Sequence, residues 1–193
     1  MNRQFEFREL VLRYFLAAVI MVITGCGKGS IASPVGDAQA ARNEPGTLAL
    51  VGYNYTDRYI DSFSVDGQGG GNINVSSPDS GGGGIVCCVL YQPGPKPKTV
   101  TVRWQSDACY YRQPSSYSNE VYNTLHSFYK EKKVVVTETT SGKGEYMEVH
   151  FYPDDSVQVV VTKELSAPRL SLSKERNDQS DFPRCPNDKK PAE

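Results

Sequence analysis

The chain has 193 residues, a formal net charge of −1 and 38% hydrophobic residues. This length suits one domain with flanking segments, and the near-neutral charge excludes a protein that grips a nucleic-acid backbone by electrostatics. Gly, Pro and Tyr are abundant at 17, 12 and 12 residues, against two His and one Trp. This composition favours a turn-rich β protein over a helical bundle or a polytopic membrane protein.

The N-terminus has the pattern of a secretory signal. Three arginines come before an apolar run over residues 14–23: Arg3, Arg8 and Arg13. The run is too short to span a bilayer, so a transmembrane anchor is the less favoured interpretation. It ends in Ile-Thr-Gly-Cys, which resembles the lipobox of bacterial lipoproteins. We therefore expect a signal peptide over residues 1–25.

The lipobox resemblance implies that Cys26 becomes the first mature residue and carries acyl chains such as palmitate, which anchor it in a membrane. Gly27 follows the cysteine, and for a lipoprotein of a Gram-negative cell this implies delivery to the outer membrane, facing the periplasm. Residues 26–46 are rich in Gly, Ala, Ser and Pro, which predicts a flexible tether between the membrane and the folded domain.

A β domain is predicted over residues 47–168. Alternating β-forming residues and turn signals predict strands at 47–55, 59–65, 73–75, 85–91, 99–105, 134–140, 145–152 and 157–162. The glycine runs at 67–71 and 81–84 predict flexible connections. The turn at 141–144 predicts a hairpin between the two strands that flank it. Residues 169–193 are predicted to be a polar, irregular tail.

One helix is predicted within this domain, over residues 119–132. Val121, Leu125 and Phe128 have helical spacing, and Ser118 is a suitable N-cap. The expected fold is therefore mainly β, a small antiparallel β-sandwich or open barrel with one helix, stapled by disulfides.

Four cysteines remain after Cys26: Cys87, Cys88, Cys109 and Cys185. An even number in an oxidising compartment predicts two disulfides. Neighbouring side chains on a strand point to opposite faces, so the adjacent pair is expected to reach two different partners, one being Cys109 and the other Cys185. A bridge within the adjacent pair is disfavoured by its strained ring. A zinc site is a minor alternative because no C-x-x-C is present.

The sequence contains no pattern that identifies an enzyme. A phosphate loop and the G-x-S-x-G of serine hydrolases are both absent, and we predict no catalytic residue, metal or cofactor. Glu148 and His150 lie two apart on the strand 145–152, so their side chains share a face. They could form an acid–base pair, but a solvated or partner-facing strand surface is the favoured interpretation.

The excess of tyrosine is the better indication of function, although a tyrosine-rich strand core is the more ordinary explanation. Tyrosine supplies a stiff contact surface with a polar tip and is enriched at protein interfaces. Core packing explains the segment 110–117 least. The candidate partner-binding residues are Tyr110, Tyr111, Arg112, Tyr117, Tyr146, Glu148 and His150.

Several short motifs carry a family resemblance. They are Gly-Gly-Gly ending at Gly71, Ser80 and four glycines leading to Cys-Cys, Val-x-Val-x-Trp ending at Trp104, Val-His-Phe-Tyr-Pro-Asp ending at Asp154, and Val-x-Val-Val ending at Val160. With these motifs the chain resembles the DUF3304 family of bacterial lipoproteins over roughly residues 47–170. The resemblance transfers no enzymatic activity. Members often neighbour phospholipase effectors of type VI secretion, which implies immunity proteins.

Three functions remain open at this point. The leading hypothesis is an outer-membrane lipoprotein that binds and neutralises a secreted phospholipase in the periplasm. The alternative is a structural envelope lipoprotein that binds peptidoglycan or another envelope protein. A small hydrolase that uses His150 and Glu148 is the third.

Overall fold

The computed structural model describes residues 45–140, 143–176, 178 and 181–192. They form eight strands and one 3-10 turn, η1 (Pro186–Asp188). The strands are β1 (Gly46–Asn54), β2 (Ile60–Val65), β3 (Gln68–Ile73), β4 (Gly82–Tyr91), β5 (Thr99–Pro114), β6 (Val121–Glu138), β7 (Tyr146–Phe151) and β8 (Val157–Thr162). The predicted signal peptide, Cys26 and nearly all of the predicted tether lie outside the described residues.

The eight strands close into a barrel in the order β1-β4-β3-β2-β5-β6-β8-β7. Two of the pairings are parallel, β1 with β7 and β6 with β8, and the others are antiparallel. The predicted β-sandwich or open barrel is therefore wrong. Closure depends on pairing β1 with β7, which starts about ninety residues after β1 ends, and such a long-range ladder leaves no local signal in the sequence.

The predicted helix over residues 119–132 is also wrong, because β6 occupies this segment. Its residues pair with β5 along the ladder from Val121 to Val135. The segment is rich in Val, Tyr, Thr and Phe, which favour strands, so its helical spacing is a coincidence that sheet pairing overrides. Among the described residues, no helix has the length and apolarity needed to cross a membrane.

The other strands follow the prediction with four exceptions. The strand predicted at 73–75 is wrong, because β3 ends at Ile73. The glycine run at 81–84 was predicted to be a flexible connection, but β4 begins at Gly82 and contains most of it. The glycine run at 67–71 lies largely within β3, where a Cβ at Gly70 would collide with the Phe63 ring. Glycine therefore makes room for a core side chain there. The predicted hairpin across residues 141–144 is absent because β8 lies between β6 and β7.

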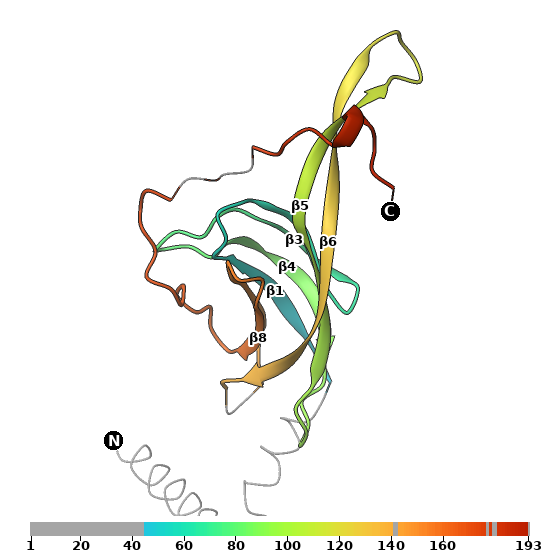
Figure 1. Ribbon diagram of the computed structural model, residues 1–193. Helices are drawn as coiled ribbons and strands as arrows, with labels where there is room; N and C mark the ends of the chain where they lie inside the picture. Colours follow the sequence, from blue (N-terminus) through green and yellow to red (C-terminus); the bar gives the residue numbers. More distant parts are fainter. Residues whose placement is uncertain (1–44, 141–142, 177, 179–180, 193) are drawn as a thin grey trace, which may run out of the picture. The chain divides into compact units, whose positions relative to one another are not determined.

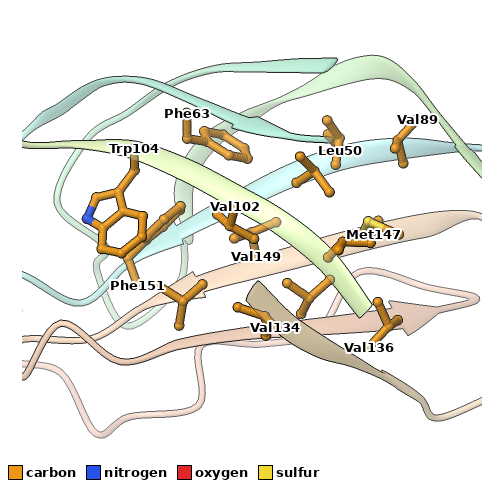
Figure 2. Packing of buried hydrophobic residues seen from close by; sticks show 14 of the residues in the cluster. Leu50, Phe63, Val89, Val102, Trp104, Val134, Val136, Met147, Val149 and Phe151 are labelled. Carbon is orange, nitrogen blue, oxygen red and sulfur yellow. The ribbon is translucent and has the colours of Figure 1, made fainter. Parts of the chain in front are cut away.

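Apolar side chains fill the inside of the barrel (Figure 2). On β7, Met147, Val149 and Phe151 point inward and are at most 1% exposed. The Phe151 ring packs edge-on against Phe63, with 5.5 Å between ring centroids, and lies 5.8 Å from Trp104. Since every second residue of a strand faces the core, the alternate residues of β7 face outward, and these include Glu148 and His150.

The β5–β6 ribbon continues past the barrel wall (Figure 1). β2 pairs with β5 only at residues 102–104, and β8 pairs with β6 only at residues 136–138. The β5–β6 ladder nevertheless runs on to the pair Pro114 and Val121. We call residues 105–129 the arm.

Candidate functional site

A buried polar network lies on the outer face of β1 and β7. Its side chains come from Tyr53, Tyr55, Glu148 and His150, and both Glu148 and His150 are completely buried. The segment 163–172, which we call the strap, follows β8 and supplies backbone partners to this network. The two residues that the sequence placed on an accessible strand surface are therefore covered, and that favoured interpretation is wrong.

The hydrogen bonds of the network form a continuous chain. The Arg169 amide donates to the Tyr55 hydroxyl at 2.9 Å, and this hydroxyl lies 3.0 Å from Nδ1 of His150. Nε2 of His150 lies 3.3 Å from Oε2 of Glu148. With the proton assigned to Nε2, the Tyr55 hydroxyl donates to Nδ1 and the imidazole donates to the carboxylate, so each group has a partner of the right kind.

The strap closes the other side of the Glu148 carboxylate. Oε1 accepts hydrogen bonds from the Ser166 amide at 2.7 Å and from the Thr162 hydroxyl at 3.3 Å. The Tyr53 hydroxyl donates to the Ser166 carbonyl at 2.7 Å and lies 3.4 Å from Oε1. The carboxylate thus stabilises the strap through the direct bond from the Ser166 amide, which is strong because one partner is charged.

Electrostatics favour an ionised Glu148 and a neutral His150. Burial by itself raises the pKa of Glu148, but the hydrogen bonds from His150 and Ser166 outweigh it and hold this pKa below its usual value. Burial lowers the pKa of His150, and the hydrogen bond to Glu148 only partly opposes this effect. Burial also raises the pKa of Tyr53, and the nearby Glu148 charge raises it further.

The tail is fastened to the arm by a disulfide between Cys109 and Cys185. The Tyr110 amide donates to the Pro183 carbonyl and the Cys185 amide donates to the Tyr110 carbonyl, both at 2.8 Å. The tail therefore adds a short parallel bridge to the outer edge of β5 (Figure 1). Tyr111 packs against the disulfide, and Arg112 pairs with Asp188 at 3.1 Å.

The second disulfide joins the neighbours Cys87 and Cys88, so the expected pairing of these residues with Cys109 and Cys185 is wrong. The reason lies in the β1–β4 ladder. Leu48 faces Val89 and Leu50 faces Val86, so the two cysteines oppose a single residue of β1. This is a β-bulge, which interrupts the alternation of side chains on which the prediction rested.

The hollows formed by the described residues include one at an end of the barrel and one beside the strap. The first, of about 180 Å³, is lined by Trp104, Phe151 and charged residues such as Arg58 and Asp107. The other, of about 450 Å³, lies between the strap and the loop 78–81, beside Tyr53 and Ile85. Within the described part of the chain, no cluster of three or more His, Cys, Asp or Glu could hold a metal ion.

The predicted partner-binding residues thus fall into two groups. Tyr110, Tyr111, Arg112 and Tyr117 lie on the arm or its tip, whereas Tyr146, Glu148 and His150 lie on the outer face of β7. Tyr117 is completely exposed, but Glu148 and His150 are not accessible to a partner while the strap covers them.

Sequence reasoning missed the strap partners Ser166 and Arg169 and the exposed aromatic residues of β6. For β6 a signal existed, since residues 121–129 contain no charge, Gly or Pro and are rich in strand-forming types. For the strap no comparable signal existed, because its contribution is made by backbone amides and carbonyls.

One protein family matches the chain. A family model described as a protein of unknown function (DUF3304) matches residues 53–159, which is more than half of the chain. The match runs from β1 to β8 and includes Tyr53, Tyr55, Glu148 and His150. No curated protein and no solved structure matches the chain.

Proposed function

The chain belongs to the DUF3304 family, and we propose that it is a binding protein: a periplasmic lipoprotein of the outer membrane that acts as an immunity protein against a secreted phospholipase. The signal at residues 1–25 and the lipobox ending at Cys26 support this location. An inhibitor needs a rigid scaffold and an accessible element that reaches its target, and it needs no chemistry of its own.

The arm is the observation that carries the proposal. It extends a two-stranded ribbon away from the barrel, and its tip presents the completely exposed side chain of Tyr117. The Cys109–Cys185 disulfide and the Arg112–Asp188 ion pair fasten the tail along the β5 strand of this ribbon. A preorganised aromatic tip loses little conformational entropy on binding, which favours affinity.

The burial of Glu148 and His150 also supports a binding role over the hydrolase hypothesis. A general acid or base must come within hydrogen-bond distance of the substrate, and the strap separates both side chains from solvent. We propose that this pair holds the strap in place.

The experiment searches the adjacent genes for a secreted phospholipase and then uses a rescue assay in cells that export it. Full-length protein is expected to restore growth, and Tyr117→Ala is expected to reduce protection. The matched control is Leu90→Ala, because Leu90 is an exposed apolar residue of β4, outside the arm. If the full-length protein accumulates in the envelope and never protects, the proposal is wrong.

A further inference from the structure

The two edges of the arm differ in whether another segment pairs with them. The β5 edge is covered at Tyr110 by the tail. Among the described residues, no strand or bridge pairs with the opposite edge of β6 from Val121 to Val135. A free strand edge presents unpaired amides and carbonyls, which makes it a template for another strand.

The backbone orientation identifies the groups that face this edge. Tyr110 directs its amide and carbonyl toward the tail, away from β6. Tyr110 faces Leu125 in the ladder, and both members of a non-hydrogen-bonded antiparallel pair point their polar groups outward. Leu125 therefore directs its amide and carbonyl to the free edge, and the same holds for every second residue of the ladder, Val121, Asn123, Ser127 and Tyr129.

Proteins commonly block such edges with charged residues, especially lysine. The block Lys130 to Lys133 contains three lysines and one glutamate, but residues 121–129 contain no charge. Part of the uncharged segment is solvent-exposed and apolar, at Val121, Tyr122, Phe128 and Tyr129. The free edge is thus unprotected on the arm and protected where β6 joins the barrel.

We propose that this edge pairs with the same edge of a second copy of the chain, antiparallel and centred on Leu125. In this register the outward amides and carbonyls of residues 121–129 meet those of the partner copy. Tyr122 faces Phe128, Val121 faces Tyr129, and Glu120 faces Lys130 across the two-fold axis. Aromatic, aromatic–β-branched and opposite-charge pairs all stabilise neighbouring strands.

Alternative registers lose this complementarity. Centring the pair on His126 places His126 opposite itself and Tyr122 opposite Lys130. Centring it on Thr124 places Glu120 opposite Phe128. Register is set by side-chain complementarity, so the arrangement centred on Leu125 is the one that the sequence of β6 favours. The result is a continuous sheet formed by the arms of two molecules.

The first test uses the full chain in the cell envelope, with a benzophenone photo-cross-linking residue at position 123 on the arm. Irradiation is expected to give a covalent product of twice the monomer mass. The matched control is position 96, which is exposed in the β4–β5 connection and lies away from the arm. A product that contains only a different protein, or no dimer at position 123, overturns the proposal.

The second test measures the dimer dissociation constant of the detergent-solubilised full chain by sedimentation. Leu125→Pro removes an outward amide without breaking the β5–β6 ladder, since proline is tolerated at such edge positions. It is expected to weaken the dimer at least about tenfold. An unchanged constant, or a wild-type chain that stays monomeric, contradicts the proposal.

A charge exchange separates pairing from any folding defect of the proline variant. Glu120→Lys is expected to weaken the dimer by up to about tenfold, because it creates like charges across the axis. Lys130→Glu is expected to do the same, and because it also removes the Lys130–Asp155 ion pair within the chain, Asp155→Asn is its matched control. The double variant restores opposite charges and is expected to recover dimerisation. If each single variant weakens the dimer and the double variant does not recover it, the proposed register is wrong.

Discussion

At the scale of residues, the position of Glu148 explains why the strap follows its observed path. The carboxylate accepts hydrogen bonds from the strap at Ser166, from β8 at Thr162 and from His150 on its own strand. A buried charge without such partners would cost several kcal/mol. The strap is therefore required by the charge that it covers, and the network and the strap stabilise each other.

Acidification is expected to destabilise the protein. The pKa of His150 is below its ordinary value of 6.5, so the unfolded state binds a proton at a higher pH than the folded state does. Stability is then lost as the pH falls below about 6.5, with a slope of at most about 1.4 kcal/mol per pH unit for one proton. The depressed pKa of Glu148 adds a further loss below about 4.5.

Urea denaturation at pH 7.5 and pH 5.5 measures this effect. His150→Gln removes the titrating group, so the variant is expected to be less stable at pH 7.5 yet to lose less stability between the two values. His126→Gln is the matched control, because His126 lies on the arm outside the network. An equal loss in wild type and His150→Gln would show that another group is responsible.

Removing the Tyr55 hydroxyl is expected to loosen the strap. Tyr55→Phe leaves the Arg169 amide and Nδ1 of His150 without their partner, at a cost of about 1–3 kcal/mol. Hydrogen exchange is expected to accelerate at the Arg169 amide. Tyr152→Phe is the control, since its hydroxyl bonds the exposed side chain of Gln158 and its loss is expected to cost less than about 0.5 kcal/mol.

The sequence predicted part of this site. The spacing of Glu148 and His150 on a strand correctly placed both side chains on one face. It did not predict their burial, because the covering groups are the backbone atoms of Ser166 and the amide of Arg169, in a segment without secondary structure. A binary pattern of polar and apolar residues cannot distinguish a solvated face from one that a later segment covers.

At the scale of elements, two glycines of the run at 81–84 differ in whether the structure leaves room for a side chain. Gly82 has a φ of +89°, and a Cβ there would collide with the Asn74 carbonyl, whereas a Cβ at Gly84 would meet open space. Gly82→Ala is therefore expected to cost more than about 3 kcal/mol of unfolding free energy, and Gly84→Ala to change it by less than about 1 kcal/mol. Thermal denaturation of the two variants tests this, and equal effects would contradict it.

The two disulfides are expected to contribute unequally to stability. Cys109–Cys185 spans 76 residues and Cys87–Cys88 spans one. By the loop-entropy argument, the long loop contributes about 4 kcal/mol and the adjacent pair almost nothing. The double variant Cys109→Ser and Cys185→Ser should therefore unfold at much lower urea than wild type.

Cys87→Ser with Cys88→Ser is the matched pair for this comparison, and it is expected to unfold close to wild type. Limited proteolysis of the tail provides a second measurement. Only loss of the Cys185 bridge should make residues 181–192 readily cleavable, because that bridge fastens them to the arm. Equal destabilisation by both double variants would refute the argument.

The elements also show where local patterns fail. The strands at 47–55, 59–65, 85–91, 99–105 and 157–162 were predicted because alternation and turn signals coincide there. In β6 the spacing of Val121, Leu125 and Phe128 fits a helix, but the partner β5 lies next to it in sequence and pairs along its length. A short apolar pattern does not separate the two structures, and the pairing decides between them.

At the scale of the whole molecule, closure of the barrel could not be predicted from local sequence. The ladder between β1 and β7 joins residues about one hundred positions apart, from Ala49 with Tyr146 to Asn54 with Phe151. β1 and β7 run parallel to each other, and parallel strands are not joined by a hairpin turn, so no turn in the sequence indicates this pairing. Composition and strand count predicted a mainly β protein, whereas its topology depends on contacts that only the folded chain defines.

This topology predicts that the barrel unfolds as a single cooperative unit, whereas the arm tip contributes little to its stability. Trp104 is the one tryptophan of the chain, and it is 5% exposed in the core beside Phe151. Its fluorescence and the far-UV circular dichroism are therefore expected to change at the same urea concentration. Phe151→Ala should lower the unfolding free energy by about 3–5 kcal/mol. Tyr117→Ala removes a fully exposed ring at the arm tip and should change it by less than about 0.5 kcal/mol. A circular-dichroism transition that precedes the fluorescence change would instead show that part of the sheet melts independently of the barrel.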